Sequence, residues 1–186
     1  MEDFEIRFSG SGGQGLQLSA KILSQALNRE AKQVSFSQSY EPTSRGGFSR
    51  ADLVVSDGIA DYPLVSSLDY LVVLDQSAFE MSLKLLREDT QVIIDARKVP
   101  NPPKGEFKLI ELPLSETALN LGNARVANIV TLGALVGISG VCRYENLLEA
   151  IRSGVPKKFL DLNLEAVAEG YKMTAPVNSP ELVAAS

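Results

Sequence analysis

The sequence predicts an α/β fold: a three-layer α/β/α domain with a mostly parallel sheet, a Rossmann-like first βα unit and a helical C-terminal third. Three observations predict it. Up to Leu112, short apolar segments typical of strands alternate with helical segments, which indicates a parallel sheet covered by helices. A glycine-rich turn joins the first strand to the first helix. From Ala124 onward, apolar residues recur at helical spacing.

The elements can be placed in order along the chain. Phe4–Phe8 alternates apolar and polar residues, as a strand does. The later strands are expected at Gln33–Gln38, Ser49–Ser56, Asp69–Asp75, Thr90–Asp95 and Phe107–Leu112. Helices are expected at Leu16–Arg29, Ser77–Arg87, Ala124–Gly140, Glu145–Ser153 and Lys157–Lys172.

Asp69–Asp75 is a continuous apolar run between two aspartates, which is typical of a central strand covered on both faces. Asp75 and Asp95 stand at strand ends and are expected to cap the turns or helices that follow. Residues 1–173 are expected to form a single α/β domain. Residues 174–186 contain two prolines and several small residues, and they are expected to form a peripheral tail.

The composition excludes several kinds of site. The chain has 186 residues, with 18 Lys and Arg against 23 Asp and Glu, so its net charge is −5 and it is a poor candidate for nucleic-acid binding. It contains no histidine, which excludes a Ser–His or Cys–His nucleophile. Its one cysteine, Cys142, cannot ligate an iron–sulfur cluster alone. Cys142 is expected to be a buried apolar residue, and no metal site is expected.

The sequence also predicts where the protein is found. The first residues have neither a basic segment nor an apolar segment of the kind found in a signal peptide. The apolar stretch Val126–Cys142 is shorter than the ~20 residues that a membrane span requires, and it is expected to be a core helix. We therefore expect a cytoplasmic protein without a membrane partner.

The first glycine motif is Gly10-Ser11-Gly12-Gly13-Gln14-Gly15, between the first strand and the first helix. Glycines allow positive φ and close approach of the backbone, and a helix N-terminus offers free N–H groups to an anion. A nicotinamide site needs an acidic residue about 20 positions further on, and Gln33–Gln38 contains none. The motif therefore indicates either phosphate or carboxylate contact or a turn whose glycines serve packing alone.

A second loop and a late helix add to this pattern. The loop is Glu41-Pro42-Thr43-Ser44-Arg45-Gly46-Gly47, in which one guanidinium stands beside a backbone free to bend around an anion. The helix places Asn128 in the otherwise apolar segment Ala-Asn-Ile-Val-Thr-Leu-Gly-Ala-Leu. Asn128 is expected either to contact a ligand or to satisfy a buried loop carbonyl.

With these three motifs in this order, the chain resembles the gamma subunit of the 2-oxoacid:ferredoxin oxidoreductases, which act on pyruvate, 2-oxoglutarate or ketoisovalerate. The likeness extends from Gly10 to about Tyr171. It implies a complex that decarboxylates a 2-oxoacid on thiamine diphosphate, passes electrons through iron–sulfur clusters to ferredoxin and releases an acyl-CoA. It also implies that these cofactors lie on partner subunits rather than on this chain, the candidate partners being alpha, beta and delta subunits.

The resemblance assigns this chain a supporting role, with no catalytic residue of its own. The chain would border the coenzyme A site, would be inactive when isolated and would then self-associate as a homodimer. The candidate ligand-contact residues carried over from the family are Gly10, Gly12, Gly13, Gln14, Gly15, Arg45, Gly46, Gly47 and Asn128. The two loops are expected to converge at the carboxyl edge of the sheet.

Two other functions remain open at the level of sequence. One is a free-standing dinucleotide-dependent oxidoreductase that uses the Gly10–Gly15 turn. The other is a homo-oligomeric anion-binding protein with no enzyme partner.

Overall fold

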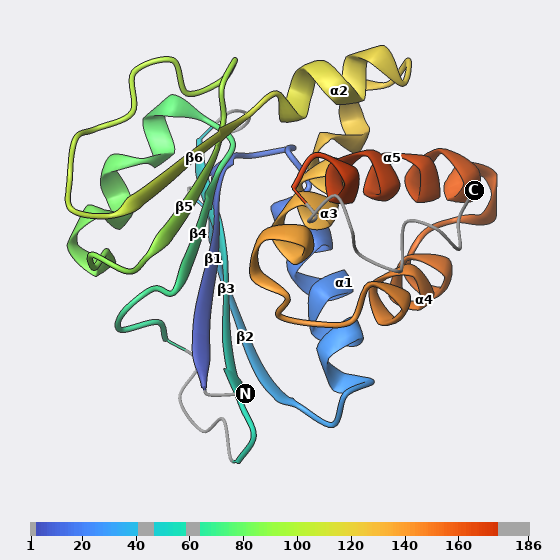
Figure 1. The fold of residues 1–186 in the computed structure, drawn as a ribbon, viewed down its shortest axis with the longest axis horizontal. Coiled ribbons are helices and arrows are strands. Elements are labelled where there is room, and N and C mark those ends of the chain that lie inside the picture. The colour runs from blue at the N-terminus through green and yellow to red at the C-terminus, as the bar shows by residue number, and fades with distance from the viewer. Residues whose placement is uncertain (1–2, 41–46, 59–63, 175–186) are drawn as a thin grey trace.

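The computed structural model describes residues 3–40, 47–58 and 64–174. Within them, six strands form one sheet (Figure 1), with bounds β1 Phe4–Ser11, β2 Gln33–Tyr40, β3 Phe48–Ser56, β4 Tyr70–Val73, β5 Gln91–Asp95 and β6 Lys108–Leu112. The α-helices are α1 Leu16–Asn28, α2 Leu114–Asn120, α3 Ala127–Ser139, α4 Tyr144–Gly154 and α5 Leu160–Lys172. Short 3-10 helices are η1 Gln76–Ala78, η2 Glu80–Leu85, η3 Ala124–Val126 and η4 Lys157–Phe159.

The sheet is mixed but mostly parallel, as predicted. Its strand order is β2-β3-β1-β4-β5-β6. The strands β1, β4, β5 and β6 pair in parallel, whereas β3 runs antiparallel to both of its neighbours, β1 and β2. The reversal has a simple cause: only residues 41–47 join β2 to β3, and a connection this short can join adjacent strands only when they are antiparallel.

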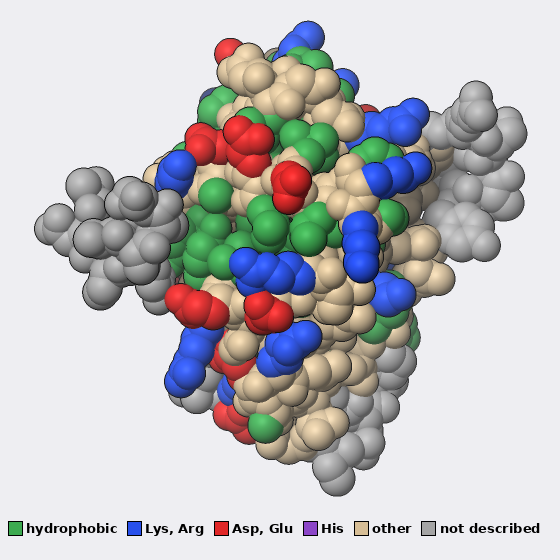
Figure 2. Space-filling model, turned by 90° about the vertical axis from the view of Figure 1, so that its right-hand side faces the viewer, with side chains coloured by type: hydrophobic (Ala, Val, Ile, Leu, Met, Phe, Trp, Pro, Cys, Tyr) green, Lys and Arg blue, Asp and Glu red, His purple; other side chains and the backbone are tan. Residues whose placement is uncertain are grey.

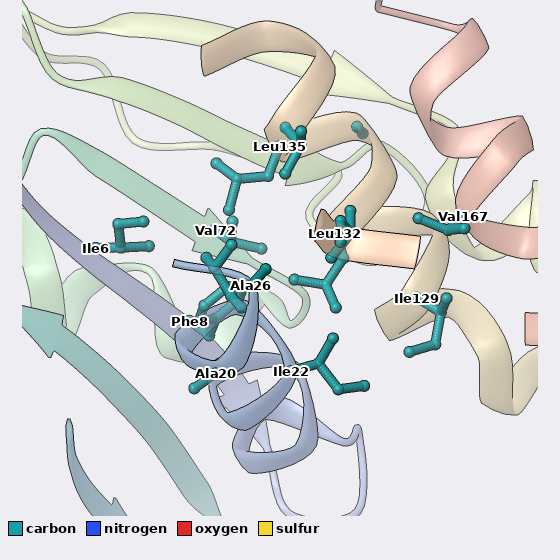
Figure 3. Close-up of a cluster of buried hydrophobic side chains, with 14 of the residues drawn as sticks. Ile6, Phe8, Ala20, Ile22, Ala26, Val72, Ile129, Leu132, Leu135 and Val167 are labelled. Atoms are coloured by element: carbon teal, nitrogen blue, oxygen red, sulfur yellow. The ribbon is translucent and has the colours of Figure 1, made fainter. Parts of the chain in front are cut away.

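One face of the sheet is covered by α-helices. Figure 1 shows α1, α3, α4 and α5 on this side. The main core lies between these helices and the sheet, where Ile6 and Phe8 of β1 meet Ile22 of α1 and Leu132 of α3 (Figure 3). The helix α3 is buried along nearly its whole length, in agreement with the predicted core helix. The helical C-terminal third thus forms one complete layer.

The opposite face is covered by the 3-10 helices η1 and η2, which occupy most of the segment Ser77–Arg87 where a helix is predicted and which differ from an α-helix in type. They close a second, smaller apolar cluster that includes Leu71, Phe79 and Ile94. A 3-10 helix advances about 2.0 Å per residue against about 1.5 Å for an α-helix. The segment therefore covers more of the sheet than an α-helix of the same length would cover.

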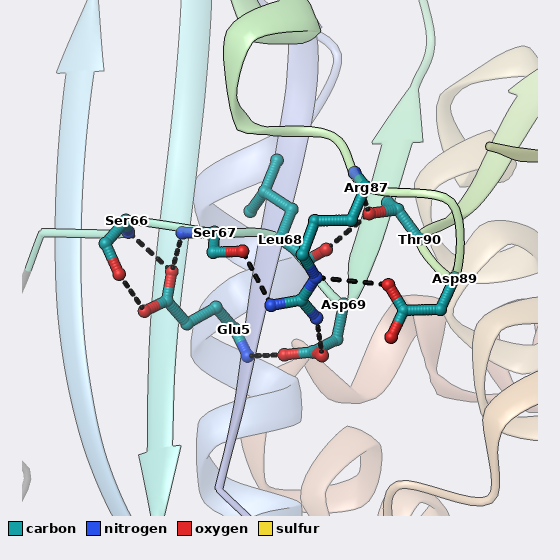
Figure 4. Close-up of polar contacts among 8 residues, drawn as sticks. All are labelled: Glu5, Ser66, Ser67, Leu68, Asp69, Arg87, Asp89 and Thr90. Atoms are coloured by element: carbon teal, nitrogen blue, oxygen red, sulfur yellow. Dashed lines mark hydrogen bonds and ion pairs between the residues drawn. The ribbon is translucent and has the colours of Figure 1, made fainter. Parts of the chain in front are cut away.

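A polar network fastens the amino ends of the central strands (Figure 4). The Glu5 carboxylate accepts hydrogen bonds from the backbone N–H groups of Ser66, at 2.6 Å, and of Ser67, at 2.9 Å. The Arg87 guanidinium donates to Asp69 at 2.6 Å and to Asp89 at 3.1 Å. These contacts lie at the end of the sheet opposite to the glycine motif and leave that other end open.

One strand boundary and one additional helix differ from the predictions and matter for the site. The first strand extends beyond Phe8 to Ser11, so Gly10 belongs to β1 and pairs with Ser49 of β3. The helix α2 was missed by the sequence analysis, because Leu114–Asn120 is too short to show a helical period. Its N-terminus faces the carboxyl end of β5.

Candidate functional site: a crevice at the carboxyl edge of the sheet

The two glycine loops meet at the carboxyl edge of the sheet. The backbone N–H of Gly12 donates a hydrogen bond to the carbonyl oxygen of Gly47 at 3.0 Å. The structure therefore brings the end of the second loop against the middle of the first. Arg45 and Gly46, the other candidates of that loop, lie outside the described residues.

Gln14 links the first loop to the neighbouring strand. Its Oε1 accepts a hydrogen bond from the N–H of Ser11 at 2.7 Å, and its Nε2 donates to the carbonyl of Leu74 at 2.8 Å. A Cβ atom at position 10 would lie only 2.2 Å from this Oε1. Gly10 is therefore needed to seat the Gln14 side chain, and both residues build the loop.

Gly13 and Gly15 supply the left-handed conformations that end the loop. Their φ values are 94° and 76°. Gly15 is the N-cap of α1, and neither a side-chain cap nor an acidic residue is found in the first turn of this helix. The positive end of the helix dipole therefore faces the carboxyl edge of the sheet without a neutralising side chain of its own.

Asn128 contributes to packing. Its side chain is 3% exposed, and its Nδ2 donates to the carbonyl oxygen of Gly15 at 3.3 Å. A Cβ atom on Gly15 would come within 2.6 Å of the same Nδ2. Two roles were expected for Asn128, ligand contact or a hydrogen bond to a buried loop carbonyl. The structure shows the hydrogen bond to the loop carbonyl.

Beside the loop lies a crevice of about 410 Å³. It opens between two connections that leave the sheet in opposite directions. The connection after β1 leads to α1 on one face, and the connection after β4 leads to η1 on the other face. Ligand crevices in open α/β sheets form at such switch points. The residues that line it are Gly13, Gln14, Leu74, Asp95, Arg97, Lys98, Ser115, Leu119, Ala124, Arg125 and Ala127.

The crevice is basic. Arg97, Lys98 and Arg125 all line it with exposed side chains. Asp95 is buried and already engaged, since its carboxylate accepts from the N–H and the hydroxyl of Ser115, both at 3.0 Å. The cationic side chains are therefore the charged groups available to a ligand, and the arrangement suits an anion such as a phosphate.

None of the sequence motifs includes these three basic residues. For Arg97 and Lys98 a signal was present, because they come two and three residues after the end of a buried strand and so had to lie near its carboxyl end. For Arg125 there was none, because the crevice wall to which it belongs is formed by segments distant in the sequence.

The remaining sequence-based expectations concern structural residues. Asp75 caps η1 by accepting from the N–H of Ser77 at 3.1 Å, as expected. Asp95 caps the turn after β5 by accepting from the N–H of Arg97 at 3.1 Å, and it also holds the start of α2 through Ser115. Cys142 is buried, and this burial raises the pKa of its thiol to about 12. In the described part of the chain, no helix is long and apolar enough to cross a membrane.

Residues 5–173 match the family of pyruvate ferredoxin/flavodoxin oxidoreductases. The chain belongs to this family. Within the family it is similar to the 2-oxoglutarate synthase subunit KorC of Methanocaldococcus jannaschii, with 36% identity over 91% of this chain and 92% of the relative. KorC of Archaeoglobus fulgidus is 34% identical over 97% of this chain and 93% of the relative.

Solved structures agree. The gamma subunit of a keto/oxoacid ferredoxin oxidoreductase from Geobacter sulfurreducens has a TM-score of 0.82 and 36% identity, covering 92% of this chain and 98% of that one. The 2-oxoglutarate:ferredoxin oxidoreductase of Magnetococcus marinus, solved with 2-oxoglutarate, coenzyme A and succinyl-CoA bound, has the same fold in 31% of its chain, with a TM-score of 0.83 and 22% identity. The resemblance to gamma subunits of 2-oxoacid:ferredoxin oxidoreductases is thereby confirmed.

Proposed function

We propose that this gamma subunit contributes the basic crevice to the coenzyme A site of its oxidoreductase and performs no chemical step itself. The observation that carries the proposal is the placement of Arg97, Lys98 and Arg125 around a glycine loop at the carboxyl edge of the sheet. Coenzyme A is anionic through its phosphates, and guanidinium groups bind phosphates through paired hydrogen bonds. Arg45, from the adjoining loop, is the further candidate for such a contact.

The composition agrees with a division of labour among subunits. We assign decarboxylation on thiamine diphosphate and electron transfer through iron–sulfur clusters to the partner subunits, with alpha, beta and delta subunits as the candidates and ferredoxin as the acceptor. This chain offers one cysteine and no histidine, so it lacks the thiolates that a cluster needs. We place the assembly in the cytoplasm. A nicotinamide dinucleotide fits the crevice less well than coenzyme A, since β2 ends without an acidic residue for the ribose.

The test uses the assembled enzyme with Arg97→Ala or Arg125→Ala in this subunit. Each change should raise the KM for coenzyme A by about tenfold or more, because a hydrogen bond to a charged group contributes roughly 1.5–3 kcal/mol. The KM for the 2-oxoacid should stay unchanged. Arg45→Ala is expected to act in the same direction.

Arg152→Ala is the matched control, because Arg152 is an exposed arginine of α4 that pairs with Glu149 at 2.6 Å and does not line the crevice. If both crevice variants keep the KM of the wild type, the crevice is a subunit contact and the proposal is wrong.

A further inference from the structure

The strand β2 is an edge of the sheet formed by the described residues. Among the described strands it stands outermost, with β3 as its neighbour (Figure 1). It is eight residues long, with the sequence QVSFSQSY, and contains neither a charged residue nor a proline. Edge strands of monomeric proteins are normally shortened, bent or charged, because a long neutral edge is a template for another strand.

The other edge shows that protection. The strand β6 has only five residues, and Lys108 and Glu111 are exposed on it. These features oppose strand addition at β6. Of the two edges of the sheet, β2 is therefore the one suited to pair with a further strand.

An apolar groove runs beside β2. Phe36 of β2 is 41% exposed and Leu18 of α1 is 38% exposed. They line a groove of about 400 Å³ between α1 and β2, together with Gln17, Lys21, Ser24 and Gln38. Backbone groups at a strand edge give affinity for an extended segment, and an adjacent apolar groove adds surface to bury.

We propose that β2 is the surface through which two copies of this chain join, edge to edge, in a two-fold symmetric sheet. We place the two-fold axis at Phe36, near the middle of the strand. In antiparallel pairing, residues that lie opposite each other point to the same face, so the two Phe36 side chains meet on the helical face. Because β2 is uncharged, no like charges of the two strands come together in any register. The partner's α1 then lies across the axis beside Leu18. This inference does not depend on the coenzyme A crevice.

The test measures the oligomeric state of the isolated full-length chain by sedimentation velocity. The wild type should be a dimer, and Phe36→Lys should raise the dissociation constant by roughly tenfold or more, because it places two like charges near the axis. Leu109→Lys is the matched control: Leu109 lies on β6 and is 37% exposed. Circular dichroism verifies that both variants fold.

A second measurement, disulfide formation between cysteine variants, tests the same contact without the lysine substitutions. Oxidation should convert Phe36→Cys, but not Leu109→Cys, into a disulfide-linked dimer, since the native Cys142 is buried. A wild-type monomer over roughly a hundredfold range of concentration, or a dimer weakened equally by both lysine variants, would overturn the proposal. An unchanged dimer in Phe36→Lys would place the contact elsewhere, and so would also overturn it.

Discussion

At the scale of single residues, the glycine motif divides into residues that build the loop and residues that line the crevice. Gly10 makes room for the Gln14 side chain, and Gly15 makes room for the Asn128 amide. Gly13 is exposed and lines the crevice. The sequence pattern leaves both anion contact and packing open for the motif, because spacing alone does not distinguish a glycine needed for internal packing from one needed for ligand approach.

Gln14→Ala should lower the free energy of unfolding by about 1–3 kcal/mol, because each of its two loop hydrogen bonds contributes about 0.5–1.5 kcal/mol. Urea unfolding followed by circular dichroism measures this change. Gln17→Ala is the control, since Gln17 is an exposed glutamine on the first turn of α1. Equal stability of the two variants would mean that the Gln14 bridge contributes nothing.

A buried ion pair lies under η2. Arg7 of β1 and Asp52 of β3 are 2% and 1% exposed, and two guanidinium nitrogens contact the carboxylate at 2.8 and 2.9 Å. A third nitrogen donates to the hydroxyl of Ser82 at 3.3 Å. Asp52 also lies 3.7 Å from the guanidinium of Arg50. Removing the Asp52 carboxylate would leave the buried Arg7 guanidinium without a counter-charge, which is far less favourable than the pair.

Asp52→Ala should therefore destabilise the protein by about 3–5 kcal/mol in chemical unfolding. The double change Arg7→Met with Asp52→Leu should recover much of that loss, because it leaves no buried unpaired charge; Arg50, which also contacts Asp52, is 32% exposed. Asp89→Ala, at an exposed pair with Arg87, should alter stability by less than about 1 kcal/mol. The expectation is refuted if the double variant is as unstable as Asp52→Ala.

At the scale of elements, the strands were predictable and the segments between them were less so. Buried strands such as β4 and β5 are short apolar runs bounded by polar residues, which makes them visible in the sequence. The segment after β4 has helical spacing, but the choice between α and 3-10 depends on the distance it must cover over the sheet. The reversed direction of β3 depends on pairing, which is not encoded within β3 itself.

The helices α3 and α5 cross at two glycines. A Cβ atom on Gly133 would lie 2.1 Å from the carbonyl oxygen of Val167, and one on Gly170 would lie 1.9 Å from that of Val130. The contacts are reciprocal, since each glycine faces the backbone of the other helix. Neither glycine has a positive φ, so close approach is the reason for glycine at both positions.

Gly133→Ala should destabilise the protein in thermal unfolding, by about 1–3 kcal/mol as overpacked cores usually do, despite the better helix propensity of alanine. Gly154→Ala is the matched control in α4, because its Cβ would meet only side-chain atoms, the nearest being Ile22 Cγ1 at 3.3 Å. A Gly133 variant as stable as the Gly154 variant would show that the helices can separate without loss.

At the scale of the whole molecule, the sequence predicted the edge of the sheet at which the crevice lies, but not its basic wall. Arg97 and Arg125 meet there only after the sheet and the C-terminal helices have packed. The surface shows a second feature that emerges from assembly. On the side where the helices lie, Figure 2 shows hydrophobic side chains gathered at the middle of the face, with charged side chains above and below them.

The stability of the molecule should fall in alkaline solution. Burial raises the pKa of the Cys142 thiol from 9.0 to about 12, and the charge of Glu30 adds to this. Burial likewise raises the pKa of Tyr144 from 10.0 to about 12. Above pH 9.0 the Cys142 thiol ionises in the unfolded chain but stays protonated in the native protein. The stability that this thiol contributes is therefore fully present below pH 9.0 and is lost as the pH rises toward about 12.

Chemical unfolding measured from pH 7 to about 11 checks this expectation. The Cys142→Ala variant lacks the thiol and should show a weaker decline of stability above pH 9.0 than the wild type. Parallel profiles for the two proteins would mean that the thiol does not contribute.

The 3-10 layer on the second face has a consequence for dynamics. Its hydrogen bonds are poorer in geometry than those of α-helices, and it closes only the smaller of the two apolar clusters. Amides of η1 and η2 should therefore exchange with deuterium by local opening, whereas amides of α3 should exchange only when the whole molecule unfolds. In 2-oxoacid oxidoreductase assemblies, this would let the side formed by η1 and η2 change conformation on contact with a neighbouring subunit, while the helical side keeps its structure.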